Sequence, residues 1–156
     1  MALLNGSAEV ERTIQCLREM IPAVLRSHIV KRCVLSNERA VADYLRSAMA
    51  FEPIEQLRVL FLNAANELLE DELFGQGTVR QIQVYPREIM KRGLELGATA
   101  LILAHNHPSG RLMPSNADKE LTRLIVLAAG PLDIVVHDHF VVGRRGVLSF
   151  RAAGFL

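Results

Sequence analysis

Apolar residues recur along this chain with two different periods, and the change falls near residue 55. Between Val10 and Leu25 they return every three or four positions, which predicts an amphipathic helix. Pro22 lies inside this pattern and predicts an end or a kink at that point. A second helix is expected to begin at Ser36, because serine is a favoured N-cap residue.

From residue 57 onward, short aliphatic runs separated by Asn, Gly and Pro predict strands alternating with helices. The expected order is strand, strand, helix, strand, helix, strand, strand, over residues 57–62, 68–74, 86–96, 98–104, 115–129, 133–136 and 140–142. Gly75 is expected to end the second strand. The pattern predicts an α/β fold with a single mixed sheet flanked by helices over residues 36–156, preceded by a helical extension of residues 1–35.

Two histidines follow the apolar run at residues 98–104. A strand carries residues i and i+2 on one face, so His105 and His107 should leave its end pointing the same way. Asp118 can supply a third ligand if the intervening loop folds back. A catalytic zinc site has three protein ligands of this kind and one open position for water.

Each part of this pattern also has an ordinary interpretation. Histidines often lie at strand ends on a surface, and Ser115 with Asp118 has the spacing of a capping box at a helix start. The interpretations of Ser115 and Asp118 are compatible, since a capped helix start is a rigid mount for a ligand. Together the features predict a metal site.

The motif resembles that of a known family. Residues 105–110 (HNHPSG), with Ser115 and Asp118 downstream, look like the JAMM metalloprotease motif and, more narrowly, the RadC group of JAB/MPN domains. The likeness continues at residues 77–78, 84–89, 138–143 and 149–154, and covers roughly residues 36–156. It implies a JAB/MPN, cytidine-deaminase-like architecture.

The resemblance also implies a reaction. Zn²⁺ would be held by His105, His107 and Asp118, and Glu55 would accept a proton from the metal-bound water. Ser115 would hydrogen-bond the oxyanion of the intermediate. The implied activity is hydrolysis of a peptide or isopeptide amide bond in a peptide or protein tail. Glu72 stays open as an alternative base, because spacing alone does not separate the two glutamates.

Two other functions stay open. One is a DNA repair or recombination factor, but a net charge of +1 gives no electrostatic support for nucleic acid. Residues 1–35 also offer no glycine-centred hairpin that could approach a phosphate. The other is a metal-bearing interaction module without catalysis. The intact ligand set and the glutamate favour chemistry over such a module.

Composition constrains the setting of the protein. No run approaches the roughly 18 apolar residues of a membrane span, and no signal segment is recognised, so a cytoplasmic protein without a membrane partner is expected. Cys16 and Cys33 are expected to be free thiols. A homodimer is possible for so aliphatic a chain. His137 and His139 repeat the spacing of the first pair and are expected to form a strand-end turn or to support the metal ligands.

Overall fold

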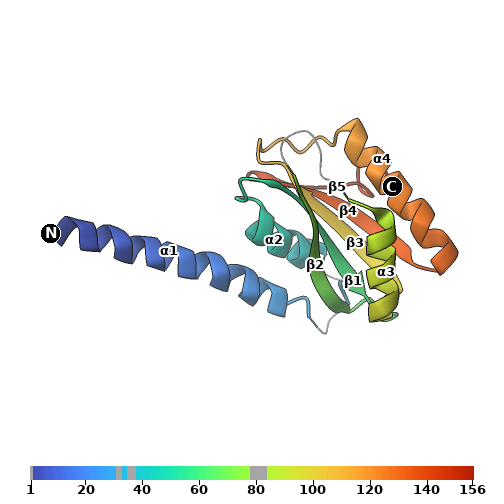
Figure 1. Cartoon of the computed structure of the whole chain (residues 1–156), viewed down its shortest axis with the longest axis horizontal. Coiled ribbons are helices and arrows are strands. Elements are labelled where there is room, and N and C mark those ends of the chain that lie inside the picture. The colour runs from blue at the N-terminus through green and yellow to red at the C-terminus, as the bar shows by residue number, and fades with distance from the viewer. Residues whose placement is uncertain (1, 31–32, 35–37, 78–83) are drawn as a thin grey trace.

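The computed structural model describes residues 2–30, 33–34, 38–77 and 84–156 and consists of one mixed sheet with helices on both faces (Figure 1). The helices are α1 (Ala2–Ser27), α2 (Glu38–Met49), α3 (Pro86–Leu96), α4 (Asn116–Ala129) and the short 3₁₀ helix η2 (Gly130–Leu132). The strands are β1 (Glu55–Leu62), β2 (Leu68–Gly77), β3 (Ala100–Asn106), β4 (Val135–Gly143) and β5 (Gly146–Ser149).

The five strands lie in the order β2-β1-β3-β4-β5. β3 and β4 are parallel, and every other neighbouring pair is antiparallel. The parallel pair is joined through α4, as a crossover of this kind requires. This arrangement confirms the predicted α/β fold with a single mixed sheet.

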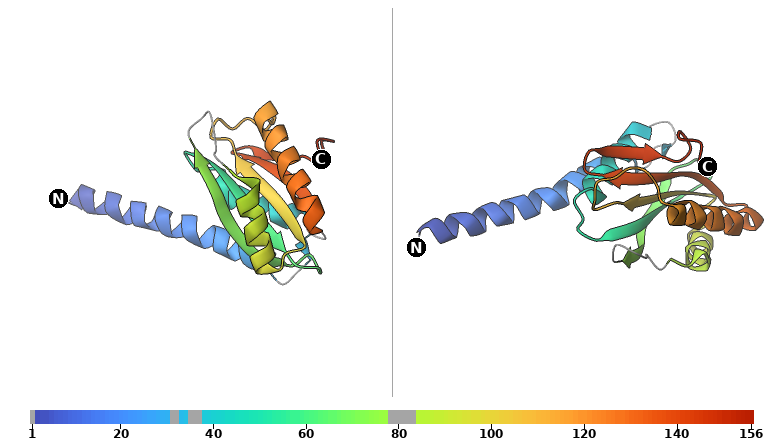
Figure 2. Two further views of the ribbon diagram at one scale, coloured as in Figure 1. Left: turned by 45° about the vertical axis from the view of Figure 1, so that its right-hand side comes forward. Right: turned by 90° about the horizontal axis from the view of Figure 1, so that it is seen from above.

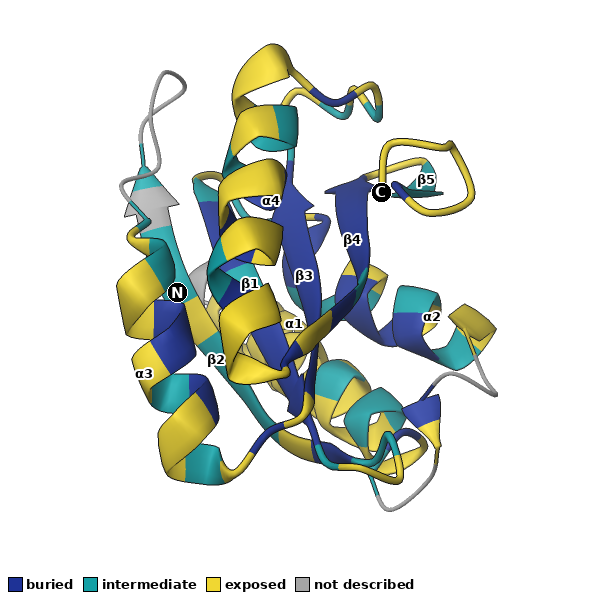
Figure 3. Ribbon diagram, turned by 90° about the vertical axis from the view of Figure 1, so that its right-hand side faces the viewer, coloured by how far each residue is buried: buried dark blue, intermediate teal, exposed yellow. Residues whose placement is uncertain are grey.

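Both faces of the sheet are covered, α2 lying on one and α3 and α4 on the other (Figures 2 and 3). Each face of the sheet has its own hydrophobic core, and successive residues of β1 point to opposite faces. Leu60 packs in the core on the α2 side, whereas Val59 and Phe61 pack in the core on the α3 and α4 side. Every residue of β3 is buried. A strand buried on both faces reads as a continuous aliphatic run, which is why the apolar segments of this body do not alternate with polar residues.

Pro22 was predicted to end or kink this helix; α1 continues past it to Ser27, so the first of these alternatives is wrong. The apolar pattern extends beyond the proline, and Leu25 packs against the core on the α2 side of the sheet. That tertiary contact favours the helix over the local loss of one hydrogen bond. Farther from the sheet, the apolar side chains that predicted the helix, such as Ile14 and Leu17, are exposed.

Two strand boundaries also differ from prediction. β2 runs through Gly75 to Gly77, because Gly75 pairs with Leu57 of β1 instead of ending the ladder. β4 is one strand where two were expected, because the polar residues 137–139 between the two predicted strands are held inside the sheet by hydrogen bonds.

The predicted cap Ser36 lies outside the described residues. In the described part of the chain, no helix has the length and apolar character to cross a membrane.

Candidate metal centre

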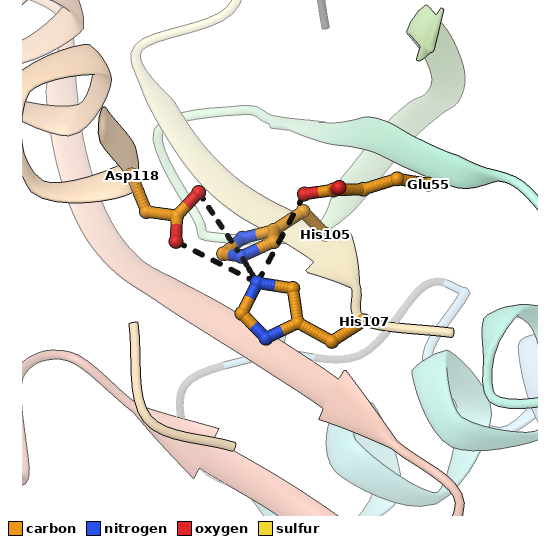
Figure 4. A group of neighbouring side chains, drawn as sticks. All are labelled: Glu55, His105, His107 and Asp118. Atoms are coloured by element: carbon orange, nitrogen blue, oxygen red, sulfur yellow. Dashed lines mark hydrogen bonds and ion pairs between the residues drawn. The ribbon is translucent and has the colours of Figure 1, made fainter. Parts of the chain in front are cut away.

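The two predicted histidines meet at the end of the central strand β3. His105 is buried within the strand, and His107 follows its last residue and is partly buried. Their Nε2 atoms face each other at 3.0 Å (Figure 4). The separation is set by the strand, which carries both side chains to one side as predicted.

Asp118 reaches the same point from the first turn of α4. Its Oδ1 lies 3.4 Å from His105 Nε2, and its Oδ2 lies 3.5 Å from His107 Nε2. A capping box orients the carboxylate: the backbone N–H of Ser115 donates to Asp118 Oδ2 at 2.6 Å, and the N–H of Asp118 donates to Ser115 Oγ at 3.2 Å. Capping and convergence on the histidines therefore occur together.

These three side chains fit a zinc ion by distance and by donor chemistry. Two ligands about 2.0–2.1 Å from a tetrahedral zinc lie roughly 3.3 Å apart, close to the three separations seen here. His107 Nδ1 contacts the carbonyl oxygen of Arg111 at 2.7 Å. Because a carbonyl only accepts, this nitrogen carries the proton, and a neutral His107 presents a lone pair at Nε2.

Glu55 stands across from the aspartate as the first residue of β1. Its Oε1 lies 3.9 Å from His107 Nε2, and the nearest donor atoms of Glu55, His105, His107 and Asp118 all fall within 4.8 Å of one another. The alternative base is elsewhere: Glu72 pairs with Arg92 of α3 at 2.6 Å. Glu55 therefore lies beside the histidines, whereas Glu72 forms an ion pair with a residue of α3.

Asn106, between the two histidines, fixes the segment that carries Glu55. Its Oδ1 accepts the backbone N–H of Gln56 at 2.8 Å, and its Nδ2 donates to the carbonyls of Glu52 and Ile54 at 3.3 and 3.1 Å. Sequence reasoning assigned this residue no such role. An amide at the end of a buried strand was the available signal, because a buried amide needs partners.

The electrostatics of the site are dominated by the aspartate and the two histidines. The hydrogen bond to Asp118 raises the pKa of His107, against the opposing effect of burial. Burial alone would raise the pKa of Asp118, but hydrogen bonds that His105 and His107 donate when protonated, together with the charge of His105, lower it far below its ordinary value. The carboxylate is therefore ionised throughout the neutral range and available to a cation.

A cleft of about 640 Å³ opens over these side chains. Its walls include the apolar side chains of Ile54, Leu57, Met113 and Leu121, and Arg111 adds a cation. Ser115 also lines the cleft, so a group bound beside Asp118 would lie within the reach of its hydroxyl.

The two histidines of the second pair, His137 and His139, have different surroundings. Both residues lie within β4, so the predicted strand-end turn is wrong. His139 lies behind His105, with its Nε2 2.7 Å from His105 Nδ1, as a supporting role requires. His137 instead contacts the side chain of Asn66. Among the described residues, one group of side chains could hold a metal, and it contains neither.

The chain is similar to a known protein family and to a protein of that kind. The model of the RadC-like JAB domain matches residues 35–155. The chain is also similar to a UPF0758 protein of Rhodobacter capsulatus, with 53% identity over 151 residues, which cover 97% of this chain and 70% of that protein. On these grounds the chain belongs to the RadC-like JAB domain family.

Proposed function

We propose that this protein is a zinc-dependent hydrolase that cleaves peptide or isopeptide amide bonds. The observation that carries the proposal is the convergence of two imidazoles, one ionised carboxylate and a separate glutamate within 4.8 Å of one another in the lining of a cleft. Three ligands and a nearby base are the parts that a hydrolytic zinc site requires.

The ligands and the base have distinct tasks in this proposal. His105, His107 and Asp118 would hold zinc, which lowers the pKa of a bound water towards about 7. Glu55, near His107 but carried by a different strand, would accept the proton of the attacking water. It would then return that proton to the leaving amine.

Ser115 is proposed to stabilise the oxyanion. Its Oγ accepts the N–H of Asp118, so the hydroxyl hydrogen remains available to a substrate oxygen. A donor of this kind contributes about 10²–10³-fold to the rate in other hydrolases. The apolar walls of the cleft and the cation of Arg111 suit an extended peptide or protein tail with an acidic group. We place the activity in the cytoplasm, where the exposed thiol of Cys16 stays reduced.

The test is to replace Glu55 and Glu72 separately with glutamine. We expect the wild-type protein to bind one zinc per chain and to cleave members of a library of fluorogenic peptides and isopeptides. Glu55→Gln should keep the zinc and lose about 10²–10⁴-fold of the rate, the usual contribution of a general base. Glu72→Gln is the matched control, because it removes a carboxylate from a half-exposed ion pair outside the site.

The outcomes separate the parts of the proposal. Full activity of Glu55→Gln would show that the base is another group. A protein that binds zinc but cleaves no substrate in the library would instead support a metal-bearing interaction module without catalysis.

A further inference from the structure

Behind the candidate metal centre, a line of buried polar groups connects His105 to Asp118. His105 Nδ1 lies 2.7 Å from His139 Nε2, and His139 Nδ1 lies 2.6 Å from Thr122 Oγ1. Thr122 Oγ1 in turn donates to the backbone carbonyl of Asp118 at 2.6 Å. The side chains of His105, His139 and Thr122 are almost fully buried, with 1%, 1% and 2% of their surface exposed. The line therefore begins at one proposed ligand and returns to another.

The positions of the hydrogens along this line follow from the group at its end, the backbone carbonyl of Asp118. The carbonyl of Asp118 can only accept, so it takes the single hydroxyl hydrogen of Thr122. The hydroxyl oxygen is then an acceptor towards the ring of His139, and His139 Nδ1 must carry a proton. A neutral His139 therefore has its lone pair at Nε2. It accepts from His105 Nδ1, which leaves the lone pair of His105 at Nε2, facing His107 and Asp118.

The surroundings of His139 favour the neutral ring that this assignment needs. The ring is buried and lies against Phe150, with 4.6 Å between centroids, and its two nitrogens contact His105 and Thr122. A neutral imidazole has one donor and one acceptor, as the line requires.

We propose that Thr122 and His139 are positioning residues that hold His105 in the Nδ1–H tautomer, with its Nε2 lone pair directed at the metal position. The inference rests on the metal site of the proposed function, but it does not depend on which bond the protein cleaves.

The opposite tautomer of His105, with its proton on Nε2, would prevent this nitrogen from binding zinc. Without an acceptor at position 122, the buried His139 Nδ1–H would have no partner, and a proton at Nε2 would become favourable. His139 would then donate to His105 Nδ1 and drive the proton of His105 to Nε2. A ligand nitrogen that carries a proton cannot bind zinc until that proton moves. Loss of a supporting partner of this type typically weakens metal binding about 10–100-fold.

The experiment measures tautomers and zinc affinity, not cleavage. Long-range ¹H–¹⁵N correlation spectra of the metal-free protein at about pH 8, where an ordinary histidine is neutral, assign the protonated nitrogen of each ring. Zinc affinity is measured by competition with a chromophoric chelator. The variants are Thr122→Val, which removes the hydroxyl at constant shape, and Thr122→Ser, which restores it. Thr13→Val is the matched control, because Thr13 donates the same type of hydrogen bond to the carbonyl of Glu9 in α1.

We expect Nδ1–H rings at His105 and His139 in the wild-type protein. Zinc binding should be about 10–100-fold weaker in Thr122→Val and close to wild type in Thr122→Ser and Thr13→Val. An Nε2–H ring at His105 in the wild-type protein would overturn the inference, and this result needs no variant to fold. Wild-type zinc affinity in a folded Thr122→Val protein would also overturn it.

The same data keep this inference apart from the proposed function. If the wild-type protein binds no zinc, the inference and the proposed hydrolase both fail. If zinc binds, the tautomers agree and affinity falls in Thr122→Val, the inference stands even where no amide is cleaved.

Discussion

Replacing Asn106 with alanine tests whether the strand end that carries the histidines also holds Glu55, the proposed base, in place. The side chain has 1% of its surface exposed and makes three hydrogen bonds to the backbone of residues 52–56. Alanine removes all three and leaves the N–H of Gln56 buried without that acceptor. The affected segment leads directly into Glu55, so the loss should appear both in stability and in the position of the base.

The size of the effect follows from these bonds. Each hydrogen bond contributes about 0.5–1.5 kcal/mol net, so we expect a loss of about 2–4 kcal/mol in the free energy of unfolding. For a domain of this size, that loss corresponds to a decrease in Tm of roughly 5–15 °C. Amide cleavage should fall by more than the unfolded fraction explains.

Asn63→Ala provides the comparison. Asn63 also makes three side-chain hydrogen bonds, at 2.9, 3.0 and 2.9 Å, but it is half-buried in the turn at the other end of β1. Water can replace its bonds, so its cost should be about 1 kcal/mol and activity should be retained. Chemical denaturation of both variants gives the free energies. Equal losses at positions 63 and 106, or an Asn106→Ala protein with unchanged activity, would refute the reasoning.

Three further results are expected. Zinc at about 1,000 times its Kd should stabilise the protein by about 4 kcal/mol, seen as a rise in Tm that a chelator reverses and that Asp118→Ala abolishes. The stability that Asp118 gives the metal-free protein through His107 should be complete below the ordinary histidine pKa of 6.5 and be lost as the pH rises through the raised pKa of His107. The difference in unfolding free energy between the wild-type protein and Asp118→Asn, followed from about pH 5 to 9, should therefore shrink with rising pH. A difference that grows with pH would contradict this expectation. Gly143→Ala should cost about 1–3 kcal/mol by denaturation, because the added Cβ would lie 3.0 Å from the carbonyl oxygen of Gly110, whereas Gly146→Ala meets its nearest atom at 3.4 Å and should cost less.

The sequence predicted the parts of the site that depend on local geometry. The spacing of His105 and His107 sets their direction along a strand, and the Ser115 cap sets the start of α4, so the convergence of these residues with Asp118 could be anticipated. α3 was predicted for the same reason, with Pro86 in its first turn and Gly97, at a positive φ of 66°, after its end.

The parts that sequence reasoning missed depend on partners far along the chain. The polar residues His137, Asp138 and His139 suggested a break in β4, but Asp138 is held by Ser149 and by the backbone N–H of Arg151, and His139 by groups of β3 and α4. No period in the sequence reveals such pairing. The roles of Asn106 and Thr122 were missed for the same reason.

The central place of β3 has a consequence for how the molecule opens. This strand is hydrogen-bonded on both edges and buried on both faces, so its amides should exchange with solvent only when the entire domain unfolds. Glu55 begins a neighbouring strand, whereas Asp118 is carried by α4, which packs on one face of the sheet and lies outside the strand ladder. An opening that detaches α4 should therefore release the aspartate first and leave the imidazoles in register, so a cation bound at the proposed site would lose its oxygen ligand before its nitrogen ligands.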